Sequence, residues 1–336
     1  MRISTLVCAL TVGLTGIAAT PAAALATPGS SPSAPGHSAS HMDMNMDMPM
    51  TGDAKPVPGR DEGTRRARQR PQFFVSALFG ANEVPVAGGP QVGDPDASAR
   101  AVARVQGDRV TFAFTWNGMQ APTLGHIHQG QRGANGDVKV PLFTTAMPDT
   151  VTAAAGNVTL ADATLADAIR NDPQGFYFNL HTKEFPGGAV RGQLSEINTK
   201  SDMLRLVGGG PLEAFMSGDQ EVPTPGGKAV GDQGGRAAAF VRAHNGRVDY
   251  AFAWAGIGTP TLGHIHQGNA GSNGDVKVPL FSTAVPEGII AIAGTVTDVD
   301  QDLVSTIANK PVGFYANLHT AEFPGGAVRG QLFPRG

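Results

Sequence analysis

The segment "QGDRVTFAFTW" (residues 106–116) carries the alternation that decides the fold class. Its large apolar residues occupy every second position: Val110, Phe112, Phe114 and Trp116. On an extended chain such residues share one face, so this stretch predicts a strand with one buried side. Residues 98–105 lead into the turn "QGDR" and complete a predicted β-hairpin.

Further short strands are predicted on the carboxyl side of this hairpin. The segments "DVKVPLF", "TVTAAAGNVTL", "GFYFNLHT" and "AVRGQL" are each bounded by Gly, Pro, Asn or Asp, at the spacing of a sandwich or barrel. One short helix is expected at residues 162–169, with Pro173 ending it. The prediction is an all-β protein of Greek-key type, like an immunoglobulin or a superoxide dismutase sandwich.

The chain repeats itself after Phe73 at a constant offset of 138 residues, as Trp116 and Trp254 illustrate. "TLGHIHQG", "NGDVKVPLF", "NLHT" and "EFPGGAVRGQL" recur unchanged. A period this long indicates complete domains, because solenoid units are about 20–50 residues long. We predict two tandem domains, at residues 72–196 and 210–334, each a β-sandwich with one short helix.

The amino-terminal residues are typical of an export signal. Arg2 is followed by an apolar run at residues 6–19 and by "ALA" at residues 24–26, which predicts cleavage near Ala24 or Ala26. Residues 27–71 are rich in Pro, Gly, Ser and Met, and this composition predicts a disordered linker. We expect a secreted or extracytoplasmic protein with no membrane span.

Composition excludes several classes of function. The only cysteine, Cys8, lies inside the predicted signal, so no disulfide, thiol nucleophile or cysteine metal site is expected in the mature chain. A formal net charge of −3 gives no basic surface for nucleic acid. Phosphate-loop and G-x-S-x-G motifs are missing, and no catalytic residue is predicted.

The methionine-rich stretch "HMDMNMDMPM" suggests metal capture. Thioether and imidazole donors suit copper, and the candidate ligands are His41, Met42, Met44, Met46, Met48 and Met50. The alternative is a low-complexity linker that happens to favour methionine.

Two histidines in "GHIHQG" stand two positions apart, so on a strand His126 and His128 project from the same face. If Phe176, Phe178 and Leu180 pack inward, His181 points away from the core and completes the set when the two strands are neighbours. The second repeat offers His264, His266 and His319. Three imidazoles suit zinc or copper; alternatively, these histidines hydrogen-bond loop carbonyls or form a structural polar cluster.

Two carboxylates and one arginine recur in both repeats and are expected to form structural polar pairs. Either Glu83 or Glu184 is a candidate partner for Arg191, because a guanidinium matches a carboxylate in two parallel hydrogen bonds. The corresponding residues of the second repeat are Glu221, Glu322 and Arg329.

Taken in order, "GANEVP", Trp116, "GHIHQG", "NGDVKVPLF" and "GFYFNLHTKEFPGGAVRGQL" resemble a CHRD domain, the module named for chordin. The second copy, from "GDQEVP" to "GFYANLHTAEFPGGAVRGQL", resembles it equally. The resemblance implies an extracellular β-sandwich. Chordin's cysteine-rich modules are absent here, so its growth-factor antagonism is not carried over.

A weaker resemblance is to Cu/Zn superoxide dismutase, in which an H-x-H strand supplies copper ligands. By that resemblance His126, His128 and His181 stand for such ligands, as do their counterparts in the second repeat. The disulfide cysteines and the zinc-binding loop histidines of that enzyme have no counterparts in this sequence.

Three hypotheses about function follow. The sequence favours a secreted, non-enzymatic binding or envelope-associated module whose partner is an extracellular protein or polysaccharide. The first alternative is a copper- or zinc-binding metalloprotein that stores metal or performs redox chemistry like that of superoxide dismutase. The second is a structural protein of the extracellular matrix.

Overall fold

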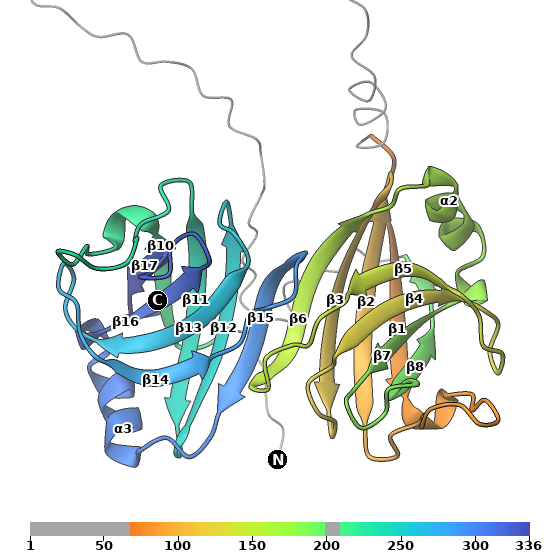
Figure 1. Ribbon diagram of the computed structural model, residues 1–336, viewed down its shortest axis with the longest axis horizontal. Helices are drawn as coiled ribbons and strands as arrows, with labels where there is room; N and C mark the ends of the chain where they lie inside the picture. Colours follow the sequence, from red (N-terminus) through yellow and green to blue (C-terminus); the bar gives the residue numbers. More distant parts are fainter. Residues whose placement is uncertain (1–67, 199–208) are drawn as a thin grey trace, which may run out of the picture. The chain divides into compact units, whose positions relative to one another are not determined.

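The computed structural model describes residues 68–198 and 209–336. The predicted signal sequence and the methionine-rich stretch with its candidate ligands lie outside the described residues. The described chain is built mainly of antiparallel strands with two short α-helices, so the all-β prediction is confirmed (Figure 1).

The first repeat forms a β-sandwich. One layer has the order β9-β1-β2-β3-β6 and the other the order β5-β4-β7-β8. A single pair, Phe79 with Arg191, joins β1 to β8 at one edge. The elements are β1 (Gln72–Phe79), η1 (Gly80–Asn82), β2 (Ser98–Gln106), β3 (Arg109–Asn117), β4 (Leu124–Gln129), β5 (Val138–Phe143), β6 (Val151–Thr159), α2 (Ala163–Asn171), η2 (Pro173–Gly175), β7 (Phe176–His181), β8 (Val190–Gln193) and β9 (Ser195–Ile197).

The chain crosses between the layers in a Greek-key manner. β6 returns to lie beside β3, and β7 returns to lie beside β4. Figure 1 shows β4, β5 and β7 crossing in front of β1, β2 and β3. This crossing brings "GHIHQG" and "NLHT", about fifty residues apart in the sequence, onto neighbouring strands.

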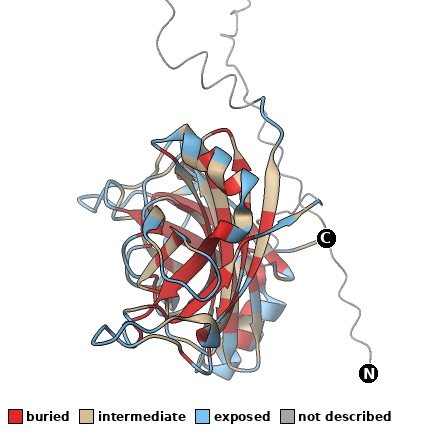
Figure 2. Ribbon diagram, turned by 90° about the vertical axis from the view of Figure 1, so that its right-hand side faces the viewer, coloured by how far each residue is buried: buried red, intermediate tan, exposed pale blue. Residues whose placement is uncertain are grey.

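The predicted hairpin is present and its apolar face forms the core. β2 and β3 pair along their whole length, from Ser98 with Asn117 to Gln106 with Arg109. Val110, Phe112 and Phe114 are fully buried. Figure 2 shows that most of the buried residues lie on the strands, whereas the loops at the ends are exposed.

Helix α2 begins at the predicted place but ends later than expected. The Asp162 side chain caps it by accepting a hydrogen bond from the Thr164 backbone N–H, at 2.8 Å. The helix runs to Asn171, because Pro173 opens the separate 3₁₀ turn η2 and so does not interrupt it. Ala166 and Ile169 are the buried residues of the helix, and Leu165 and Ala168 pack against the core from partly buried positions.

The second repeat has the same order of elements and the same pairings. Its elements are β10 (Leu212–Ser217), η4 (Gly218–Gln220), β11 (Arg236–His244), β12 (Arg247–Ala255), β13 (Pro260–Gln267), β14 (Val276–Phe281), β15 (Ile289–Val296), α3 (Gln301–Asn309), η5 (Pro311–Gly313), β16 (Phe314–Thr320), β17 (Val328–Gln331) and β18 (Phe333–Pro334). β15 also pairs with β6 of the first repeat, in antiparallel register.

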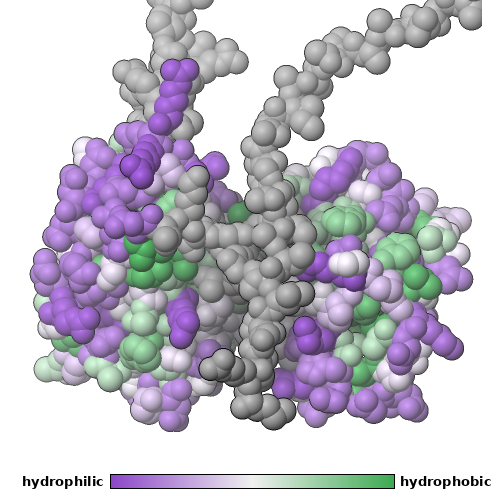
Figure 3. Space-filling model, turned by 180° about the vertical axis from the view of Figure 1, so that it is seen from behind, coloured by the Kyte–Doolittle hydropathy of each residue, from purple (hydrophilic) through white to green (hydrophobic). Residues whose placement is uncertain are grey.

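The surface is mixed in character. The face in Figure 3 carries hydrophilic residues interrupted by small hydrophobic patches. The most exposed large apolar side chains include Phe79, Phe215 and Phe333. Among the described residues, neither helix has the length and apolar character needed to cross a bilayer.

Candidate metal centre

Strand β4 presents its two histidines on the outer face of the β5-β4-β7-β8 layer. Ile127, between them, is fully buried in the core. His126 and His128 therefore point to the opposite side, because successive side chains on a strand alternate. Both are partly buried.

Strand β7 alternates in the same way and supplies the third histidine. Phe176, Phe178 and Leu180 pack in the core. His181 therefore lies on the outer face, where it is 8% exposed. β7 pairs with β4, and Leu124 lies opposite His181. Both conditions set from the sequence therefore hold: the apolar residues of β7 pack inward, and the two histidine-bearing strands are neighbours.

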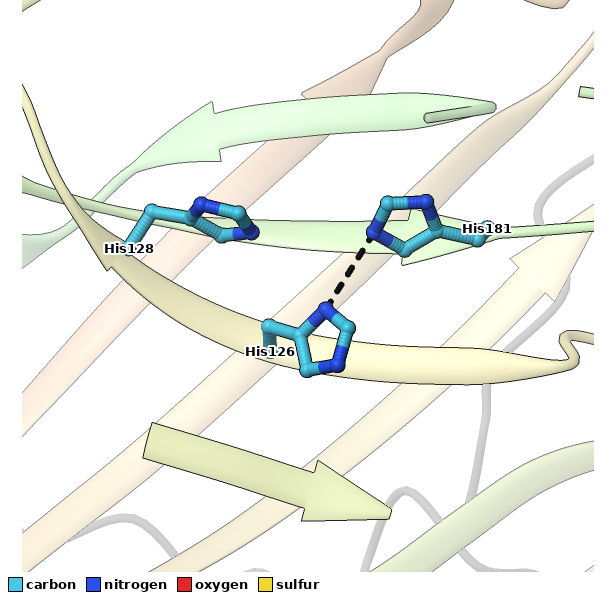
Figure 4. Close-up of side chains that lie close together, drawn as sticks. All are labelled: His126, His128 and His181. Atoms are coloured by element: carbon cyan, nitrogen blue, oxygen red, sulfur yellow. Dashed lines mark hydrogen bonds between the residues drawn. The ribbon is translucent and has the colours of Figure 1, made fainter. Parts of the chain in front are cut away.

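The three imidazoles converge on one point (Figure 4). One ring nitrogen from each of His126, His128 and His181 lies within 4.8 Å of the other two. His126 Nδ1 is 3.2 Å from His181 Nε2. Three donors at metal–nitrogen distances of about 2.0–2.1 Å in a tetrahedral site lie about 3.4 Å apart, so a shared ion requires the most widely spaced ring nitrogens to approach one another by up to about 1.4 Å.

Backbone carbonyls fix which nitrogen of two rings carries the proton. His128 Nδ1 lies 2.9 Å from the Gly136 carbonyl oxygen, and His181 Nδ1 lies 2.9 Å from that of Pro186. A carbonyl only accepts, so each Nδ1 donates and each Nε2 keeps its lone pair. A carbonyl behind the ring is the usual support of a metal-binding histidine.

One of these lone pairs has no partner. Among the described residues, His128 Nε2 is buried and accepts no hydrogen bond, and the same holds for His266 Nε2. A buried acceptor without a donor costs free energy. A bound cation would satisfy it.

The electrostatic surroundings keep the rings neutral. Burial, with smaller contributions from His181 and His128, lowers the pKa of His126 to about 4. Burial also lowers the pKa of His128 and His181 from the ordinary value. Neutral imidazole is the form that binds metal, so these three histidines need not lose a proton at neutral pH.

The second repeat reproduces this geometry. His264 Nδ1 lies 3.1 Å from His319 Nε2. His266 Nδ1 bonds the Gly274 carbonyl at 2.9 Å, and His319 Nδ1 lies 3.2 Å from the Pro324 carbonyl. Burial, followed by His319 and His266, lowers the pKa of His264 to about 4.

Tyr177 and Arg191 stack in a row against the ring of His128. The rings of His128 and Tyr177 stack with centroids 4.8 Å apart, and the Arg191 guanidinium lies 3.4 Å from the Tyr177 centroid. Arg191 is 1% exposed and donates to the carbonyls of Gln131 and Ala134. It therefore holds the loop whose Gly136 carbonyl orients His128.

The two carboxylates predicted as partners of Arg191 lie in different environments. Glu184 and Glu322 are exposed. Glu83 is close enough to interact electrostatically with Arg191, but among the described residues no carboxylate lies within 4 Å of that guanidinium. Glu83 instead accepts a hydrogen bond from Asn179 Nδ2, at 3.2 Å.

Sequence reasoning did not single out Tyr177 or Asn179 as parts of the site, nor Tyr315 and Asn317 in the second repeat. The alternation within "FYFNLH" carries the signal, because it places residues 177, 179 and 181 on one face. The supporting carbonyls of Gly136 and Pro186 come from loops, whose path the local pattern does not specify.

Comparison with known families agrees with this architecture. The CHRD domain model matches residues 74–194 and again residues 212–332. The chain therefore belongs to the CHRD-domain family, with two tandem copies. CHRD domains are modules of extracellular type. No curated protein matches the chain.

Proposed function

We propose that this protein is an exported metal-binding protein in which each CHRD domain, at residues 72–196 and 210–334, holds one copper or zinc ion through three histidines. The observation that carries the proposal is the convergence of three imidazole donors in both repeats. Among the hypotheses from the sequence, this geometry favours the metalloprotein over a module without metal.

The chemistry of the donors supports copper or zinc. The lone pairs offered are Nε2 of His128 and His181, together with Nδ1 of His126 once its proton sits on Nε2. Three neutral nitrogens suit these two metals, while magnesium and calcium prefer oxygen ligands. Storage or delivery of the ion needs no further group, so the proposed role is non-enzymatic.

Export is part of the proposal. The charged start, apolar run and small residues before Thr27 support secretion or an extracytoplasmic location. Copper capture by His41 and the alternating methionines remains a separate prediction about the linker.

The test is metal loading of the full mature chain. Protein purified without affinity metal is incubated with Cu²⁺ or Zn²⁺, dialysed and analysed for metal, with the expectation of two ions per chain from the domains. The variant with His126, His128, His264 and His266 all changed to Ala should lose both. Any copper that it keeps measures the contribution of the linker.

His244→Ala is the matched control, because His244 pairs with Asp249 at 2.8 Å and belongs to neither cluster. The Cu²⁺ form should show nitrogen hyperfine coupling by electron paramagnetic resonance; the quadruple variant should lose the part of this signal that comes from the domains, and His244→Ala should keep it. Equal metal content in the wild type and the quadruple variant would overturn the proposal and leave the binding-module hypothesis.

A further inference from the structure

A carboxyl group outside the histidine cluster occupies a pocket built for it in each repeat. Glu83 follows the turn η1 and packs against Gly188, where an added Cβ would lie 2.7 Å from Glu83 Oε1. Gly188 has φ of +136°, a conformation that favours glycine. In the second repeat, Gly326 makes the same room for Glu221.

The hydrogen bonds around this carboxyl lack one donor. Asn179 Nδ2 donates to Glu83 Oε2 at 3.2 Å, and Asn317 Nδ2 donates to Glu221 Oε1 at 2.6 Å. Among the described residues, no group donates to the buried Oδ1 of either asparagine, nor to Glu83 Oε1. Both asparagines are less than 5% exposed.

A proton on the carboxyl supplies the missing donor. An amide oxygen and an ionised carboxylate both only accept, whereas a protonated carboxyl carries one O–H. With that proton, the acid and the amide can form two hydrogen bonds in opposite directions. The buried Oδ1 of the asparagine then accepts a hydrogen bond in each repeat.

The surrounding charges do not compel ionisation. The charged groups that face Glu83 are Arg191 on β8 and Arg132, which lines the same cavity; Asn179 on β7 is neutral. Arg191 directs its hydrogen bonds to Asn135 Oδ1 and to two carbonyls. Burial outweighs Arg191 and Asn179 and raises the pKa of Glu83 to about 7, and it does the same for Glu221.

This carboxyl lies one strand away from the histidines. Asn179 is directly opposite His126 on β4 and opposite Arg191 on β8. Side chains in such a row are neighbours, with Cβ atoms about 4.5–5.5 Å apart. A divalent ion on the histidines therefore places positive charge next to the asparagine that holds Glu83, which favours the ionised carboxyl.

We propose that Glu83 and Glu221 are the proton-bearing partners of the two metal sites: each is protonated in the metal-free protein and releases its proton when a divalent ion binds the histidines. The proton passes to solvent, and for Glu83 a cavity of about 540 Å³ opens beside the carboxyl. The carboxylate left behind offsets the charge of the ion. The coupling rests on the proposed metal function, while the protonated state can be tested without metal.

The test uses Glu83→Gln with Glu221→Gln in the full chain. Glutamine keeps the shape and the donor of the protonated acid but cannot ionise. The control is Glu184→Gln with Glu322→Gln, which alters the exposed carboxylates of the same repeats. In the metal-free wild type, carbon-13 NMR of the glutamate carboxyls should show two groups that titrate near pH 7 and that vanish in the Gln variant.

The coupling is measured by calorimetric titration with Zn²⁺ at pH 6 in buffers of different ionisation enthalpy. The wild type and the control should release about one more proton per site than the Gln variant, and at pH 8 the Gln variant should bind Zn²⁺ about tenfold more weakly. If no glutamate titrates above pH 6, the protonated state is wrong. If two do but proton release is unchanged, only the coupling is wrong, and if Zn²⁺ does not bind at all, the proposed function itself fails.

Discussion

The two repeats differ most where they only need to fold and least where the histidines lie. Helices α2 and α3 share an aspartate cap and two buried apolar residues but little else. By contrast, the distance from Arg to the Tyr centroid is 3.4 Å in one repeat and 3.5 Å in the other, and the His–Tyr stack measures 4.8 Å and 4.7 Å. The comparison shows that two different helices complete the same sandwich, whereas the ring geometry of the histidine face is nearly identical in the two repeats.

The largest expected effect comes from removing one histidine pair at a time. His126→Ala with His128→Ala should reduce the metal content from two ions to one, and His264→Ala with His266→Ala should do the same. The reason is that two of three donors are lost in one repeat while the other cluster is untouched. Metal analysis measures the stoichiometry, and far-ultraviolet circular dichroism checks the fold. Loss of both ions from either variant would show that the repeats do not bind independently.

Arg191→Met is expected to destabilise the first repeat by about 3 kcal/mol or more, and Arg329→Met should do the same to the second. Each arginine is almost fully buried and donates to two loop carbonyls. A methionine leaves those acceptors without donors, and charged hydrogen bonds contribute about 1.5–3 kcal/mol each. Denaturant unfolding measures the loss.

Arg191→Lys is the control for charge alone, since an ammonium cannot reproduce the planar fork or the stack on Tyr177. It should recover only part of the lost stability. A loss below about 1 kcal/mol in Arg191→Met would contradict the stabilising role assigned to the hydrogen bonds of Arg191.

Glu83 and His126 are expected to change the stability of the protein with pH in opposite directions. The pKa of Glu83 is raised to about 7 from 4.5, so its contribution to stability is complete below pH 4.5 and is lost as the pH rises to 7. The pKa of His126 is lowered to about 4 from 6.5, so its contribution is complete above pH 6.5 and is lost as the pH falls toward 4. The two slopes oppose each other between pH 4.5 and 6.5.

Glu83→Gln with Glu221→Gln removes only the contribution of these carboxyls to the pH dependence of stability. The metal-free variant should gain stability relative to the wild type as the pH rises to 8, on the order of 3 kcal/mol per repeat. In acid it should lose stability more steeply than the wild type, because the histidine slope is no longer opposed. Denaturation midpoints at pH 4.5, 5.5, 6.5 and 8 measure this. Parallel curves for the two proteins would contradict the raised pKa.

Much of the fold could be predicted from the sequence, because strand alternation is local. The apolar positions of "VTFAFTW" and "FYFNLH" define both the core and the face that carries the histidines. The 138-residue offset predicted the second domain. The pairing of Glu83 with Asn179, 96 residues later in the chain, could not be predicted, because it depends on how the loop after Glu83 bonds to the segment that leads into β8. The recurrence of a glutamate and an arginine in both repeats favoured an ion pair, whereas the structure bonds Glu83 to the Asn179 amide and Arg191 to Asn135 and two loop carbonyls.

The smallest expected effect compares Ser76 with its counterpart Ala214, both buried on the first strand of their repeats. Among the described residues, the Ser76 hydroxyl has no hydrogen-bond partner. Ser76→Ala should therefore raise the free energy of unfolding by about 1 kcal/mol, and Ala214→Ser should lower it by a similar amount, because a buried hydroxyl without a partner is costly. Denaturant unfolding of both variants measures the pair. A loss of stability in Ser76→Ala would mean that the hydroxyl is satisfied, and that the two repeats differ at this position in their hydrogen bonds as well as in their packing.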